Sequence, residues 1–171
     1  LKNDWGLWMK ARDKCIVAFI YFLALRPKEA CCLRFDDFNM EDATVKIRGE
    51  NNKQRKDRVL PIPSKLLPFL RNYLAFPRER FWKGSPYLFP SFQSQHISPE
   101  RWKNRFRQIL KEAGLWKPPK NTTIPPYRSY TLRHTRATEL LNKTKDIFLV
   151  ANILGHSKLS STKIYLHRTR N

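Results

Sequence analysis

Apolar residues recur along most of the chain at the spacing of an α-helix. The longest apolar run, residues 15–25, belongs to a segment over 8–25 that we predict to be a buried helix ending before Pro27. Proline suits the first turn of a helix, so a short second helix is predicted over 28–33. The same reasoning, with start and stop residues, predicts further helices at 64–73, 98–113, 132–142, 146–154 and 161–167.

Residues 43–62 follow a different pattern. Residues 43–48 alternate between apolar and polar types, as in a strand, and residues 58–62 form a second candidate strand. The polar and basic stretch between them predicts a β-hairpin with a long basic loop. Pro61 has no N–H to donate, so its strand is expected at a sheet edge. The sequence therefore predicts an α+β fold, mainly α, with a small antiparallel sheet.

The charge of the chain points to a polyanionic partner. Lys and Arg total 34 against 14 Asp and Glu, a formal net charge of +20. Such an excess repels itself unless an anion offsets it, and nucleic acid is the usual anion. A ribosome or an anionic membrane surface also fits. The predicted helix at 98–113 has a basic face that is either solvated or in contact with phosphates; its members are Arg101, Lys103, Arg105, Arg107 and Lys111.

The cysteines indicate neither a metal site nor a disulfide framework. Cys15, Cys31 and Cys32 are odd in number and lack the spacing of zinc ligands. We expect buried free thiols and therefore a reducing, intracellular location. The apolar run at 15–25 is too short to cross a bilayer, so no membrane association is expected. No cofactor is indicated.

Four short segments hold side chains suited to phosphate chemistry. They are Leu25-Arg26-Pro27-Lys28-Glu29, Tyr130-Thr131-Leu132-Arg133-His134-Thr135, Leu154-Gly155-His156-Ser157 and Thr162-Lys163-Ile164-Tyr165-Leu166-His167. Their order resembles the tyrosine recombinase (phage integrase) family, which has an LRxxE box, an HxLRH box, an LGH box and a tyrosine nine residues beyond the last histidine. Tyr165 lies nine residues after His156. The resemblance covers residues 8–167, and the basic, compact character is similar to archaeal and archaeal-virus integrases.

This resemblance implies the tyrosine recombinase catalytic-domain fold and a site-specific DNA recombinase. Such an enzyme cuts and rejoins double-stranded DNA through a 3′-phosphotyrosyl intermediate, without metal or ATP, as in the integration of viral or plasmid DNA. It also implies self-association on DNA as a tetramer. Residues 1–171 are then one catalytic domain, expected to be the C-terminal part of a longer integrase. The N-terminal core-binding domain of such an integrase is not expected within these residues.

The chemistry accounts for the residue types in these boxes. Cleavage of a phosphodiester without metal needs a nucleophile, cationic donors for the developing charge and an acid for the leaving oxygen. By the resemblance, Arg26 and Arg133 clamp the scissile phosphate with their planar forks, and His156 donates a hydrogen bond to it. Tyr165 is the nucleophile, and Glu29 either orients Arg26 or caps its own helix.

The family also uses a lysine of the β-hairpin loop as general acid toward the 5′-oxygen. Counting back from the predicted strand at 58–62, the matching residue is Lys53, with Lys56 as the second candidate. Otherwise the loop cations, including Arg55 and Arg58, contact only the DNA backbone.

One residue departs from the family pattern. Tyr130 stands where the HxLRH box has a histidine. A tyrosine donates a hydrogen bond to phosphate but is a poor base at neutral pH, because its pKa is about 10. The group that deprotonates Tyr165 is therefore open. His134 is assigned a structural role in its helix.

Three alternatives remain at this stage. A type IB topoisomerase shares the chemistry but relaxes supercoils in one duplex. A basic DNA-binding module without chemistry would tolerate Tyr165→Phe. A ribosomal or RNA-binding protein is disfavoured, because the aromatic residues fall at core spacing.

Overall fold

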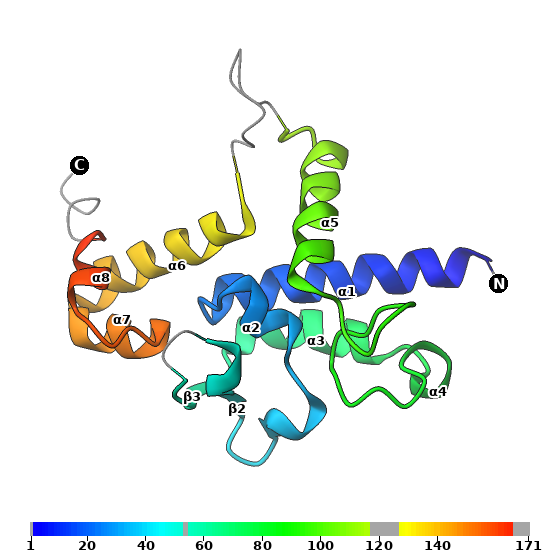
Figure 1. The fold of residues 1–171 in the computed structure, drawn as a ribbon, viewed down its shortest axis with the longest axis horizontal. Coiled ribbons are helices and arrows are strands. Elements are labelled where there is room, and N and C mark those ends of the chain that lie inside the picture. The colour runs from blue at the N-terminus through cyan, green and yellow to red at the C-terminus, as the bar shows by residue number, and fades with distance from the viewer. Residues whose placement is uncertain (1, 53–54, 117–126, 166–171) are drawn as a thin grey trace.

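The computed structural model describes residues 2–52, 55–116 and 127–165, which fold mainly into helices around one long N-terminal helix (Figure 1). This helix, α1 (Lys2–Phe22), buries one apolar face against the rest of the chain through Cys15, Ile16, Phe19 and Ile20. It starts earlier than the sequence predicts. It also ends earlier, because Ala24 takes a left-handed φ of 50°.

The next helix, α2 (Pro27–Cys31), begins one residue before the predicted range of 28–33 and ends two residues before the end of that range. Arg26 has an extended backbone (φ −68°, ψ 146°), the conformation that a following proline favours. The Arg26 backbone N–H donates to Glu29 Oε2 at 2.8 Å. This bond turns the Glu29 carboxylate back toward the start of its own helix.

A three-stranded antiparallel sheet follows, in the order β1 (Phe38–Asn39), β2 (Thr44–Ile47), β3 (Arg58–Pro61). Val45 pairs with Leu60 and Ile47 with Arg58. The strand with Pro61 lies at the edge, which confirms the prediction. The two-residue β1 was not predicted.

The middle of the chain packs along α1, from Phe22 to Trp5 near its N-terminal end. Here lie α3 (Leu67–Leu74), α4 (Arg78–Phe81) and α5 (Pro99–Glu112). The four-residue α4 was not predicted. Aromatic rings fill the core at this end, among them Trp8, Tyr73 and Trp82. The Ser98 hydroxyl accepts a hydrogen bond from the Arg101 backbone N–H at 3.3 Å and caps α5, as predicted.

The last helices, α6 (Ser129–Thr144), α7 (Ile147–Leu154) and α8 (Ser160–Lys163), gather at the opposite end of α1 (Figure 1). They enclose a second, smaller apolar cluster, whose buried members are Ala24, Ala137, Leu141, Val150, Leu154 and Tyr165. Asp146 caps α7 by accepting from the backbone N–H groups of Phe148 and Leu149. Within the described ranges, no helix has both the length and the apolar character needed to cross a bilayer.

Candidate active site

The buried carboxylate of Glu29 organises a cluster of three arginines from three parts of the chain. Arg58, at the start of β3, binds it with both terminal nitrogens, at 2.8 Å and 2.9 Å. Arg26 Nη1 donates to Glu29 Oε1 at 3.1 Å, and Arg133 Nη1 lies 3.7 Å from Oε2. Burial alone would raise the pKa of Glu29, but hydrogen bonds and charge from Arg58 outweigh it and lower the pKa.

Backbone carbonyls hold the same arginines in place. The Leu154 carbonyl, at the end of α7, accepts from Arg133 Nη2 at 2.7 Å and from Arg26 Nη1 at 3.3 Å. Arg133 Nη1 also donates to the Ala24 carbonyl at 2.6 Å. Cations are stabilised at the C-terminal end of a helix, where the carbonyl groups lack helical partners. The end of α7 therefore fixes both predicted phosphate-binding arginines.

This cluster has more positive than negative charge. Three guanidinium groups face one carboxylate, so the arginine cluster of Arg26, Arg58 and Arg133 with Glu29 has a net charge of about +2. Burial, and then the charge of Arg26, lower the pKa of Arg133 to about 10. Arg133 therefore remains charged at neutral pH, but a bound anion would stabilise it further.

His156 lies beside this cluster, just after the left-handed Gly155 that ends α7. Its Nδ1 is 2.8 Å from Thr162 Oγ1 on α8, and its Nε2 is 3.4 Å from Arg133 Nη2. Arginine can only donate, so this network assigns the ring proton to Nδ1 and the acceptor role to Nε2. Burial, followed by the charge of Arg133, lowers the pKa of His156 to about 4. The imidazole is therefore neutral at pH 7 in the free protein.

Tyr165 lies just beyond α8 and is only 1% exposed. Its ring packs in the apolar cluster that includes Ala24 and Leu154, whose carbonyls bind Arg133. Its hydroxyl is 2.7 Å from Nδ1 of His134, the residue that follows Arg133 on α6. The structure thus brings Arg26, Arg133 and Tyr165 into one region. It also shows that His134 contacts the Tyr165 hydroxyl. The sequence analysis assigned His134 only a structural role and did not predict this contact.

The other predicted site residues lie farther out. Tyr130, in the first turn of α6, is 46% exposed, and its ring centroid is 6.5 Å from that of His134. Lys53 lies outside the described residues. Lys56, the second candidate for the general acid, is exposed on the hairpin loop.

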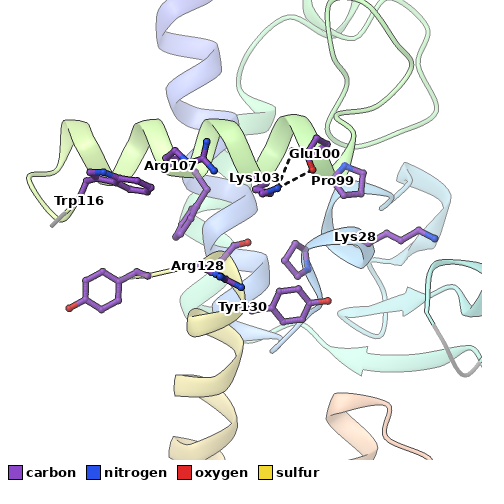
Figure 2. A pocket seen from close by; sticks show the side chains of 12 residues that line it. Lys28, Pro99, Glu100, Lys103, Arg107, Trp116, Arg128 and Tyr130 are labelled. Atoms are coloured by element: carbon purple, nitrogen blue, oxygen red, sulfur yellow. Dashed lines mark hydrogen bonds and ion pairs between the residues drawn. The ribbon is translucent and has the colours of Figure 1, made fainter. Parts of the chain in front are cut away.

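A cleft of about 530 Å³ lies between α5 and the start of α6, next to α2. Figure 2 shows Lys103 and Arg107 on the α5 side, with Lys28, Arg128 and Tyr130 opposite. Four of these five side chains are cationic.

The predicted basic face of α5 is divided in the structure. Lys103 and Arg107 line the cleft, whereas Arg105 binds the buried Asp13 and Glu112. Phosphate contact is thus open only to part of the predicted face.

Sequence reasoning missed the inward position of Arg58, which it treated as one of the loop cations. The signal was present in the alternation of β3, where exposed Val59 separates Arg58 from buried Leu60. Arg58 also donates through Nε to the Ile153 carbonyl at 3.0 Å. A Cβ added at Gly155 would lie 2.9 Å from Arg58 Nη1, so a side chain there would displace the guanidinium.

Comparison with known proteins decides the family of this chain. A profile described as "Phage integrase family" matches residues 8–171. The chain belongs to the phage integrase family. Its fold is the catalytic-domain fold of tyrosine recombinases, as the four boxes implied.

Named relatives support the same assignment. Tyrosine recombinase XerA of Pyrococcus furiosus is 38% identical over 163 residues, which cover 94% of this chain and 51% of that protein. Tyrosine recombinase XerD of Pseudomonas putida is 31% identical over 96% of this chain and 52% of that protein. The chain thus spans about half the length of the curated relatives it matches.

Solved structures agree with the fold. The XerH site-specific recombinase bound to difH substrate, in a pre-cleavage complex, superimposes with a TM-score of 0.74 at 27% identity, covering 94% of this chain and 44% of that chain. The catalytic domain of bacteriophage HP1 integrase has a TM-score of 0.60 at 21% identity, covering 99% of this chain and 87% of that chain. At 21% identity, the similarity to HP1 integrase supports the fold and no further property.

Proposed function

We propose that this chain is the catalytic part of a site-specific DNA recombinase that cuts and rejoins double-stranded DNA through Tyr165. The observation that carries the proposal is the arginine cluster, with its excess charge of about +2, beside a tyrosine hydroxyl. One scissile phosphodiester would bring one negative charge to this cluster. The family membership gives the proposal its reaction class.

Arg26 and Arg133 bind the two non-bridging oxygens of the phosphate in this proposal. Both are already oriented by Glu29 and Leu154, so binding requires little reorganisation, and their charge counters the negative charge that develops in the transition state. A bound phosphate also removes part of the repulsion that lowers the pKa of His156. His156 can then take up a proton and donate to the phosphate, the role that the sequence predicts for it.

Tyr165 Oη attacks phosphorus and the bond from phosphorus to the 5′-oxygen breaks. Lys53 gives the departing oxygen a proton, as the family resemblance implies. The product is a 3′-phosphotyrosyl bond that keeps the free energy of the broken ester, so a 5′-hydroxyl can reseal the strand without ATP or metal. Because Tyr165 is buried in the free protein, the attack needs DNA binding to expose its hydroxyl to the phosphate.

The basic cleft between α5 and α6 leads the DNA backbone toward the arginine cluster. Lys103, Arg107 and Arg128 contact phosphates there, and Tyr130 donates a hydrogen bond from the cleft edge. The relative XerH is described as bound to difH substrate, which supports a DNA duplex as the partner. Recombination of two duplexes breaks four strands, so we propose a tetramer on DNA, in an intracellular, DNA-associated setting, as in integration of viral or plasmid DNA.

The test uses nicked, end-labelled duplexes from a pool with randomised sequence around the nick. The nick lets the short cleaved piece diffuse away, so a covalent intermediate accumulates. We expect SDS-resistant protein–DNA adducts that enrich one sequence over selection rounds and that are absent with Tyr165→Phe. Adducts that persist in Tyr165→Phe, or that disappear only on metal chelation, would overturn the proposal.

Plasmid substrates separate recombination from topoisomerase activity. The selected sequence is placed once on a supercoiled plasmid, or twice on the same plasmid. A recombinase gives exchanged products that depend on two sites. Relaxation that is equally fast without the selected sequence would assign the chain to a topoisomerase-like activity instead.

A further inference from the structure

The hydrogen bond between His134 and Tyr165 bears on a step that the sequence leaves open. The family's box begins with a histidine, and in this chain Tyr130 holds that position. Tyr130 is half-exposed at the cleft, and a phenol is a poor proton acceptor at neutral pH. His134 lies four residues further along α6, one helical turn away, so the two side chains share a face of the helix.

We propose that His134 is the general base that takes the proton of Tyr165 during DNA cleavage. The inference rests on the proposed function, because it needs Tyr165 as the nucleophile. His134 Nδ1 already lies 2.7 Å from Tyr165 Oη, within the range required for direct proton transfer. The unperturbed pKa of an imidazole, about 6.5, suits a base that works near neutral pH.

The surroundings of the hydroxyl favour proton loss toward His134. Arg133 precedes His134 on α6, and the charge of Tyr165 influences the pKa of Arg133, which places the hydroxyl within the field of a buried guanidinium. That cation stabilises a phenolate. The Tyr165 ring packs among apolar side chains, including Ala137 and Leu141, which are also on α6.

The O–H bond of Tyr165 breaks as its proton moves to Nδ1 of a His134 that has its own proton on Nε2. The phenolate oxygen forms the bond to phosphorus as the bond to the 5′-oxygen breaks, and that oxygen takes a proton from Lys53, the proposed general acid. On resealing, the 5′-hydroxyl returns its proton to Lys53 as its oxygen attacks phosphorus, and the phenolate leaves and takes the proton back from the His134 imidazolium.

The first measurement needs no DNA. Long-range proton–nitrogen correlation spectra of the ¹⁵N-labelled chain identify which ring nitrogen of His134 is protonated, and His134→Asn assigns the signal. We expect the proton on Nε2 at pH 7.5, with Nδ1 as acceptor. A proton on Nδ1, donated to the tyrosine oxygen, would overturn the proposal whatever the enzyme does with DNA.

The second measurement is single-turnover adduct formation on the nicked duplex selected above. His134→Ala removes the imidazole, whereas His134→Asn keeps an oxygen acceptor near the Nδ1 position but has no basicity. Both should slow cleavage by about 10²- to 10⁴-fold, the usual contribution of a general base. His96→Gln, on an exposed loop where His96 stacks on Tyr87, is the matched control and should cleave at the wild-type rate. A wild-type rate and pH profile in His134→Asn would mean that His134 only positions Tyr165.

A more acidic phenol distinguishes a His134 that acts as a base from a His134 that only positions Tyr165. Replacing Tyr165 by trifluorotyrosine, which ionises near neutral pH, removes the need for a base. We expect it to restore most of the rate lost in His134→Asn and to make that variant insensitive to pH above neutrality. If His134→Asn slows cleavage by the same factor with trifluorotyrosine as with tyrosine, the proposal is overturned. If wild type and Tyr165→Phe both fail to form adducts, the proposed function fails, and the tautomer measurement still decides the hydrogen-bond geometry.

Discussion

Two buried carboxylates in this chain are both held by arginines, but the charges around them add up differently. Asp13 on α1 binds Arg12 and Arg105, and Arg105 also binds Glu112, so two cations face two anions. Glu29 on α2 faces three cations, and within the described part of the chain no second carboxylate pairs with them. The Asp13 group links α1 to α5 with equal numbers of positive and negative charges. The Glu29 group has an excess of positive charge that an anionic ligand can neutralise.

The pKa shifts follow the same division. Burial opposes the charge of Arg105, but Asp13 and Glu112 outweigh it and raise its pKa. Arg133, buried more deeply and close to Arg26, has its pKa lowered to about 10. Arginine burial alone therefore does not mark an active site. What distinguishes the arginine cluster is that its positive charges exceed its negative ones, beside the tyrosine hydroxyl that we propose as the nucleophile.

The largest expected effect is on stability, from Glu29→Gln. Three guanidinium groups would then lie together without a carboxylate. We expect the free energy of unfolding to fall by about 3–5 kcal/mol, as for other broken buried ion pairs. Asp13→Asn should lower it less, because Glu112 still neutralises Arg105. Urea unfolding followed by circular dichroism measures both, and equal losses would remove the distinction between the clusters.

Single arginine substitutions should affect activity in the Glu29 cluster and stability in the Asp13 cluster. Arg26→Gln removes one donor to the phosphate, so adduct formation should slow by about 10²- to 10³-fold. Stability should change little, since the cluster becomes less positive. Arg12→Gln should lower the free energy of unfolding by about 1.5–3 kcal/mol and leave the rate of adduct formation unchanged. Reversed outcomes for the two variants would contradict the assignment of the clusters.

Gly155→Ala perturbs the arginine cluster through Arg58. A left-handed φ of 63° disfavours any side chain, and the added Cβ would push against Arg58. We expect about 1–2 kcal/mol of destabilisation from the backbone, together with slower adduct formation. Gly114→Ala is a matched control, because Gly114 has φ 69° and nothing within 4 Å of the added Cβ. Gly114→Ala should lose similar stability and keep the wild-type rate.

The smallest expected effect is a pH dependence of stability from His156. Its pKa is about 4 in the folded chain against an ordinary 6.5, so the unfolded chain binds more protons between these values. The stabilisation is complete above pH 6.5 and is lost as the pH falls toward 4. We expect a loss of about 1 kcal/mol, since solvent screens the half-buried ring. The difference in urea midpoint between wild type and His156→Gln at each pH isolates this contribution from that of His96, whose pKa is also lowered.

Much of the fold follows from local sequence signals. The predicted helix at 146–154 differs by one residue from α7 (Ile147–Leu154), because Asp146 and Gly155 cap it at both ends. The short β1 and α4 escaped prediction, since each depends on tertiary packing more than on periodicity. The prediction also misplaced both ends of α1.

The site was predictable in part. Arg26, Arg133 and His156 meet where the boxes imply, because helix ends and a turn fix them in sequence. The inward course of Arg58 and the contact of His134 with Tyr165 depend on how β3, α6 and α8 pack together. Spacing along the chain does not encode those distances.

The most direct test of the account is to map the covalent bond in the adduct. Nuclease trimming and tandem mass spectrometry of the trapped complex identify the modified residue, and end-labelling identifies the polarity of the cut. We expect a 3′-phosphate on Tyr165 and a free 5′-hydroxyl on the released strand. A bond to any other residue, or a 5′-phosphate on the protein, would contradict the role given to the arginine cluster and to Tyr165.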